Sequence, residues 1–302
     1  MKYEDAMAIR DEYYEISEPS VDDDFAFTEA LGELIRESGH PRYMAELAWF
    51  YCSRKRFDLE EKYLLMAAEC GYGPAFEELG YMYYFGQNGE KDFSKAFEYY
   101  TKGAQPDEYG NEGSLWCVYK LADMYRFGCY VAKDEGRYRD MIEDAYGKVK
   151  NARSLGEPFP EIAYRLAGIR AEQGREQEAL ALLRKAKRFL AERLSYDPFW
   201  GHIEVMGRIV LLMHRLAPSG GVKADFYDLF FLTQRPGSYA LTRMGQPLVL
   251  SVTQDGEGLT IEFGGRYYRD FADLCGKASV DGRRVTEIYD EFYKIGEIGQ
   301  GA

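Results

Sequence analysis

Apolar residues recur with a helical period through most of the chain. Four stretches each place a Leu directly before a small residue, and in the first three a Tyr follows three residues after the small one. These sets are Leu47, Ala48 and Tyr51; Leu79, Gly80 and Tyr83; Leu121, Ala122 and Tyr125; and Leu166 with Ala167. Because residues three or four apart share a helix face, each set forms one stripe, and its small residue lets another backbone approach closely.

A second helical pattern follows each of these stretches. The four patterns read "EEKYLLMAAECG", "KAFEYYTKGA", "RYRDMIEDAYG" and "EALALLRKAKRFL". Pairs of short helices cannot bury their apolar faces alone, but stacked neighbours can. The pattern therefore predicts a mainly α chain whose helix-turn-helix repeats form an α/α superhelical solenoid.

The segments around the repeats predict a cap and a closing helix. Two helical patterns, "MKYEDAMAIRDEYYEI" and "DDDFAFTEALGELIRESG", precede the repeats, and the acidic run of the second suits a helix N-terminus. We expect residues 1–38 to cap the array. After the repeats, "YDPFWGHIEVMGRIVLLMHRL" predicts a long apolar helix with Pro198 in its first turn. The repeats and this closing helix make up a predicted domain of residues 39–216.

Beyond "APSGG", residues 217–221, the apolar period changes from helical to two. The segments "SYALTR", "LVLSVTQ" and "LTIEF" alternate apolar and polar residues, and "RYYRD" is a fourth short strand in this interpretation. A short helix, "ADFYDLFFL", is expected before the strands, and two helices, "DFADLCGKA" and "VTEIYDEFYKI", after them. Residues 223–302 are therefore predicted to form a small α+β domain with an antiparallel sheet.

The repeats resemble a known family. From Pro160 to Arg193, six residues follow the spacing of the tetratricopeptide repeat: Leu166, Ala167, Gly174, Ala179, Leu183 and Ala186. The second and third units carry longer loops, "GQNGEKD" and "GCYVAKD", and so look like the related Sel-one-like repeats. The resemblance covers about residues 39–195 and is most specific for residues 75–104. The departures from the pattern are the missing loop glycine of the first unit, Tyr138 and Arg170.

Composition excludes some partners. The chain has 302 residues and a net charge of -13, and residues 1–38 alone carry 12 acidic and 3 basic residues. Such a surface repels a nucleic-acid backbone, so we expect no nucleic-acid partner. No apolar run approaches the ~20 residues that span a bilayer, and the N-terminus lacks a signal-peptide pattern, so we expect no membrane partner and a cytoplasmic location. The five cysteines contain no CxxC motif and are expected to be reduced and mostly buried.

Helical solenoids usually bind partners with the first helix of each pair. With the Leu and small residue as register, the groove-facing positions carry aromatic and charged side chains suited to a peptide or protein partner. The candidate groove residues are Trp49, Glu77, Tyr81, Tyr84, Trp116, Tyr119, Asp123, Arg126 and Tyr164, with Cys52 and Phe127 beside them. The competing interpretation is that several of these rings only pack against neighbouring helices.

A catalytic site finds little support in the sequence. The three histidines, His40, His202 and His214, lack metal-binding spacing, and no Ser, His and Asp set carries a motif such as GxSxG. "GYGPAFEELG" lacks the preceding strand and the lysine of a phosphate loop, and the adjacent Glu77 and Glu78 point in different directions on a helix. We therefore expect no catalytic residue, no metal and no cofactor.

Three functions stay open at this point. The resemblance implies a bacterial-type cytosolic scaffold or adaptor that binds a peptide or protein in the groove, which makes the protein non-catalytic. A second hypothesis is immunity- or inhibitor-type capture of a toxin or enzyme by the C-terminal domain, whose edge strand could accept a peptide. The third is an enzyme whose site lies in the C-terminal domain.

Overall fold

The structure, a computed structural model, describes residues 1–197, 200–217, 222–256 and 258–298. The chain forms two compact units, Met1–Ala145 and Tyr146–Ala302. Pro198 and most of the predicted boundary at 217–221 lie outside the described residues. The division into residues 1–38, 39–216 and 223–302 stays a prediction.

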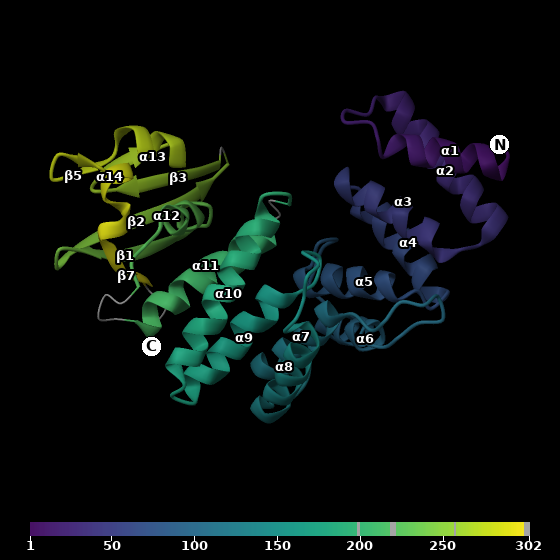
Figure 1. The fold of residues 1–302 in the computed structure, drawn as a ribbon. Coiled ribbons are helices and arrows are strands. Elements are labelled where there is room, and N and C mark those ends of the chain that lie inside the picture. The colour runs from purple at the N-terminus through teal and green to yellow at the C-terminus, as the bar shows by residue number, and fades with distance from the viewer. Residues whose placement is uncertain (198–199, 218–221, 257, 299–302) are drawn as a thin grey trace. The chain divides into compact units, whose positions relative to one another are not determined.

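The first unit consists of helices that follow one another as antiparallel pairs (Figure 1). Their bounds are α1 Tyr3–Tyr13, α2 Val21–Ser38, α3 Pro41–Ser53, α4 Phe57–Glu69, α5 Gly73–Phe85, α6 Phe93–Gly103, α7 Leu115–Phe127 and α8 Glu135–Val149, the last of which crosses into the second unit. The pairs α3–α4, α5–α6 and α7–α8 are the first three predicted repeats. Helices α1 and α2 pack on each other, and α2 packs on α3, as a terminal cap would.

The ends of α2 show how local sequence determines a helix. Ser20 is the N-cap: its hydroxyl accepts a hydrogen bond from the backbone N–H of Asp23, whose carboxylate accepts one in return from the Ser20 N–H. This capping box satisfies two N–H groups that have no partner inside the helix. Gly39 ends the helix with a φ of 65°, a left-handed conformation that glycine adopts without strain. The helix therefore begins one residue before the acidic run from which we predicted its start.

The predicted stacking residues are confirmed as core. Leu79 and Ala48 are fully buried, and a Cβ atom built on Gly80 would lie 2.4 Å from Cδ1 of Tyr100 on α6. The absence of a side chain at Gly80 therefore makes room for a buried ring of the partner helix. Tyr83 is also buried and stacks on Tyr99, with ring centroids 5.7 Å apart.

The longer loops of the second and third pairs are built alike. Gly86 and Gly128 end α5 and α7 with φ of 71° and 70°. The backbone N–H of Asp92 donates to the Tyr83 carbonyl, and that of Asp134 donates to the Tyr125 carbonyl, each at 2.9 Å. The two Asp side chains then accept hydrogen bonds at the start of α6 and α8. The glycine and aspartate that flank each loop thus end one helix and begin the next.

The second unit joins one helix pair to a sheet. Its helices are α9 Phe159–Glu172, α10 Glu176–Leu194, α11 Trp200–Leu216, α12 Phe226–Thr233, α13 Phe271–Lys277 and the single turn α14 Val285–Ile288. Its strands are β1 Gly237–Arg243, β2 Gln246–Asp255, β3 Gly258–Phe263, β4 Arg266–Tyr268, β5 Ser279–Val280, β6 Arg283–Arg284 and β7 Phe292–Glu297. Five of them form an antiparallel sheet in the order β4-β3-β2-β1-β7, and β5 pairs with β6. The predicted fold class, helical repeats followed by a small antiparallel sheet, is confirmed.

One predicted element in this unit is wrong. "VTEIYDEFYKI" was expected to be a helix, but only Val285–Ile288 is α-helical, and residues 292–297 form β7 beside β1. Phe292 and Ile295 are buried in the core between the sheet and its covering helices. Tertiary pairing with β1 therefore outweighs the weak helical period of this segment.

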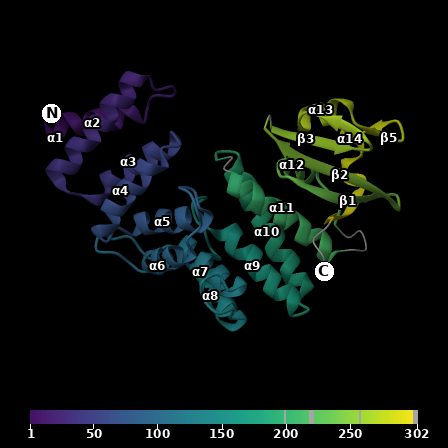
Figure 2. The same ribbon diagram turned by 180° about the vertical axis from the view of Figure 1, so that it is seen from behind.

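Helix α11 contacts the helix pair and the sheet within the same unit. It packs against α10 on one side and against β7 and α12 on another, as both views show (Figures 1 and 2). Near it, Lys187 of α10 forms ion pairs with Asp225 and Asp228, and Asp228 is only 2% exposed. Since Asp225 is also the N-cap of α12, the same charges fix the start of this helix.

Candidate functional site

The first helices of the pairs in the first unit bring a set of polar and aromatic side chains together. We call this set the α3–α5–α7 face. It comprises Trp49 and Cys52 on α3, Glu77, Glu78, Tyr81, Tyr84 and Phe85 on α5, and Trp116, Tyr119 and Lys120 on α7. The stripe of small residues turns toward the second helices, as Gly80 does toward Tyr100, so these larger side chains are left on another side of each helix.

Three carboxylates gather on this face. Burial raises the pKa of Glu78 to about 7, and the negative charges of Glu77 and Glu60 raise it further in the same direction, while a hydrogen bond from Trp49 opposes the rise. Burial also raises the pKa of Glu77, whose carboxylate accepts a hydrogen bond from the Ser114 hydroxyl. Glu60, on α4, is 2% exposed, and burial raises its pKa too.

These carboxylates lack a cationic partner among the described residues. No Lys, Arg or His of residues 1–197, 200–217, 222–256 and 258–298 forms an ion pair with Glu60, Glu77 or Glu78. Trp49 lies beside Glu78 and is 42% exposed, which is high for a tryptophan. The arrangement is suited to a cation that arrives from outside, with its apolar stem on the indole ring.

A second part of the face already holds a cation of the chain. Nζ of Lys120 lies 4.6 Å from the ring centroid of Phe85, 5.3 Å from that of Tyr84 and 6.0 Å from that of Tyr81. Tyr81 and Phe85 also contact each other, with centroids 4.5 Å apart. The rings of α5 are therefore electron-rich surfaces that a cation binds, and part of that surface is occupied by Lys120.

The predicted groove residues differ in exposure. Trp49 is exposed; Glu77, Tyr81, Tyr84, Trp116, Arg126 and Tyr164 are half-buried; Tyr119 and Asp123 are buried. Tyr84 packs against Phe93 and Tyr100 at the edge of the core. Arg126 donates a hydrogen bond to the Tyr138 hydroxyl at 2.9 Å, and Trp116 contacts Tyr119. Tyr164, on α9, belongs to the second unit.

Around the carboxylates the structure brings together Trp49, Glu77 and Tyr81 from the predicted set, and it adds residues outside that set, namely Glu60, Glu78, Phe85 and Lys120. Glu78 lies three positions before Tyr81, so helical spacing could have placed both on one face. Lys120 follows the predicted Tyr119 directly. Glu60 gives no such signal, because only the packing of α4 against α5 brings it near Glu78.

The cysteines and His40, which the sequence also singled out, have structural roles or ordinary surroundings. Cys117 is buried and the other four cysteines are half-buried, so the expectation that they are mostly buried is wrong. The pKa of the Cys52 thiol is raised to about 12 by burial, so it stays protonated at neutral pH. His40 is the N-cap of α3, and its ring accepts a hydrogen bond from the Arg42 N–H.

The described part of the chain holds neither a cluster of metal-ligating side chains nor a helix fit to span a membrane. Within it, no set of three or more His, Cys, Asp or Glu side chains is arranged to hold a metal ion. None of the helices that the structure describes is long and apolar enough to cross a membrane.

No protein-family model matches the sequence, and no curated protein matches it. Similar solved structures include a Sel1 repeat protein from Oxalobacter formigenes, 28% identical over 40% of this chain and 88% of that one, with a TM-score of 0.34. A protective antigen of uropathogenic Escherichia coli with an SLR fold is 17% identical over 65% of this chain, which spans 49% of that protein, with a TM-score of 0.38. A thermophilic TPR protein of Thermus thermophilus is 15% identical over 70% of this chain and 99% of that one, with a TM-score of 0.40.

The four helix pairs, with their shared Leu and small-residue positions, have the helix-turn-helix pattern of Sel1-like and TPR-like repeats. The resemblance predicted from residues 39–195 is thereby confirmed. Stacked helix pairs in general form extended surfaces.

Proposed function

We propose that the protein is a non-catalytic scaffold or adaptor and that its α3–α5–α7 face binds a protein or peptide partner with a basic segment. The observation that carries this proposal is the trio Glu60, Glu77 and Glu78, which has no cationic partner among the described residues and lies beside the exposed ring of Trp49. A Lys or Arg of the partner supplies the missing charge.

The electrostatics favour such a partner. The pKa of Glu78, raised to about 7, leaves its carboxyl partly protonated at neutral pH, and an approaching cation lowers that pKa and releases the proton. The net charge of -13 also attracts a basic segment over a longer range. Trp49 and Tyr81 add rigid aromatic area that loses little conformational entropy on binding.

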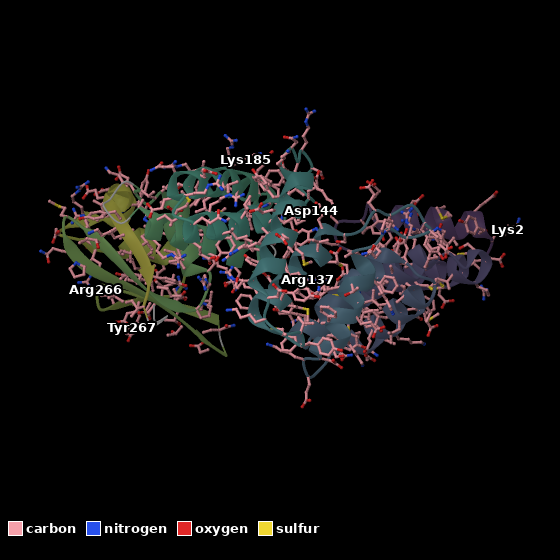
Figure 3. The ribbon with its side chains drawn as sticks, turned by 90° about the horizontal axis from the view of Figure 1, so that it is seen from below. Lys2, Arg137, Asp144, Lys185, Arg266 and Tyr267 are labelled. Atoms are coloured by element: carbon pink, nitrogen blue, oxygen red, sulfur yellow. The ribbon has the colours of Figure 1, made fainter. Side chains whose placement is uncertain are left out.

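A pull-down with paired variants tests this proposal. Trp49→Ala and Glu78→Gln should each reduce recovery of the partner at least tenfold, because one removes the ring and the other the charge. Tyr267→Ala is the matched control, since Tyr267 is an exposed aromatic of the second unit, 72% exposed on β4 (Figure 3). All variants should keep the thermal midpoint of the wild type within a few degrees.

The pH dependence of binding gives a second readout. Because Glu78 must lose its proton to pair with a cation, affinity should rise between pH 6 and pH 8 in the wild type and stay flat in Glu78→Gln. Recovery lost in Tyr267→Ala and retained in Trp49→Ala would overturn the proposal. That result would favour capture by the C-terminal domain through its β4 edge instead.

A further inference from the structure

The second unit contains a cavity of about 420 Å³ beside α10, α11 and α12. Its lining comes from α10, α11, α12 and the segment that leads into α12, namely Arg184, Lys187, Arg188, Ala191, Met206, Met213, Val222, Lys223, Asp225, Tyr227 and Phe231. Small-molecule sites in proteins typically have volumes of about 300–1,000 Å³. The cavity is therefore large enough for a ligand and is formed by residues far apart in sequence.

The rim of this cavity is positively charged. Arg184 and Arg188 lie one helical turn apart on α10, and Lys223 belongs to the segment before α12. No residue of the described ranges forms an ion pair with any of the three. Like charges four residues apart in a helix cost about 0.2–0.5 kcal/mol, so this arrangement is unfavourable without an anion. It also stands out in a chain whose net charge is -13.

The fourth cation of the cavity has a different role. Lys187 is held by Asp225, with Nζ and Oδ2 2.6 Å apart, and by the buried Asp228. Its charge is thus compensated inside the protein, and it anchors α12 against α10. One lysine and two aspartates leave one negative charge at this end of the cavity, so Arg184, Arg188 and Lys223 give the site a net charge of about +2.

The walls of the cavity are apolar. Met206 is fully buried, and Met213, Val222 and Phe231 are nearly so, while the ring of Tyr227 is 64% exposed at the rim. Flexible thioether side chains adapt to ligands of different shape, and an exposed ring covers a bound apolar group. Cations at the rim and apolar walls together indicate a ligand with two chemically different ends.

We propose that this cavity binds a small organic oxyanion, a carboxylate or phosphate monoester with an apolar body. The guanidinium groups of Arg184 and Arg188 bind the oxyanion in forked geometry, and Lys223 adds a third positive charge. The apolar body lies against Met206, Met213 and the ring of Tyr227. This inference is independent of the proposed scaffold function, because it concerns only residues of the second unit.

Calorimetric titration of the full chain at low salt tests the site with three probes below their micelle concentrations: octanoate, octyl phosphate and octanol. At least one oxyanion should bind one-to-one and at least tenfold more tightly than the neutral octanol. The variant Arg184→Gln/Arg188→Gln should weaken that binding at least tenfold. Tyr227→Ala should weaken it severalfold, since it removes apolar contact but no charge.

A control variant separates a built site from general charge attraction. Arg215→Gln/Arg266→Gln removes the same two charges from exposed positions of the same unit that do not line the cavity; Arg266 is on β4 (Figure 3). It should bind the oxyanion within twofold of the wild type. No one-to-one binding to the wild type, octanol that binds as tightly as the oxyanions, or equal loss in the control and in Arg184→Gln/Arg188→Gln would each overturn the proposal.

Discussion

Replacing Glu78 by Gln should make the protein more stable at pH 8 and leave its stability nearly unchanged at pH 4.5. Glu78 has a pKa of about 7 in the folded protein, raised by burial and then by the charges of Glu77 and Glu60. A glutamate whose pKa is higher in the folded than in the unfolded protein contributes to the free energy of unfolding at pH values below its unfolded pKa, which is near 4.5. That contribution is lost as the pH rises from 4.5 through 7.

The size of the effect follows from the pKa difference. A rise from 4.5 to about 7 corresponds to about 3 kcal/mol of free energy of unfolding at pH 8, at 1.36 kcal/mol for each pKa step. Glu78 is half-buried, so solvent screening reduces the expected value to about 1–2 kcal/mol. The isosteric Gln keeps the hydrogen-bonding shape and removes the charge.

Urea unfolding at pH 4.5, 6, 7 and 8, followed by tryptophan fluorescence, measures the difference between wild type and Glu78→Gln. Trp49, which lies beside Glu78, reports on this part of the chain. Glu29→Gln is the control, because it removes a carboxylate from an exposed position of α2. A Glu78→Gln difference that is equal at pH 4.5 and pH 8, or a variant less stable than wild type at pH 8, would refute the reasoning.

Two further substitutions test the packing. Gly80→Ala should destabilise the protein by about 1–3 kcal/mol, because the new Cβ would meet the buried ring of Tyr100. The control is Gly147→Ala, where no atom lies within 4 Å, and it should be neutral or slightly stabilising in the same urea assay. Equal losses of stability in the two variants would contradict the role given to Gly80. Lys187→Met should cost about 3–5 kcal/mol because it removes the lysine that pairs with the buried Asp228. Adding Asp228→Asn should recover part of the loss, so a double variant as unstable as Lys187→Met would argue against a buried charge as the cause.

The helix pairs were predictable because their signals are local. The Leu79 and Gly80 pair, the glycine at 86 and the aspartate at 92 act within one helix and its loop, so the residue pattern alone located them. Segment 285–295 was mispredicted for the opposite reason. Its buried Phe292 and Ile295 are spaced three apart, as in a helix, and only pairing with β1 makes them part of a strand.

The candidate site was only partly predictable. Helical register located Trp49 and Tyr81, and the same spacing could have added Glu78. The proton affinity of Glu78 depends on Glu60, which lies 18 positions away on another helix, so no local pattern reports it. The cavity rim was even less predictable from the sequence, because Arg184 and Lys223 come from segments almost 40 residues apart.

The sequence by itself determined the repeats of this protein, because a helix period, a small residue at the contact and a glycine at the turn act over a few residues. Tertiary structure alone decided which acidic side chains are buried and which charged side chains gather without forming an ion pair. Glu60, Glu77 and Glu78 are ordinary acids in sequence, and Arg184, Arg188 and Lys223 are ordinary bases. Burial and Coulomb interactions depend on distances through space, and packing brings each group together without an ion pair to a described residue.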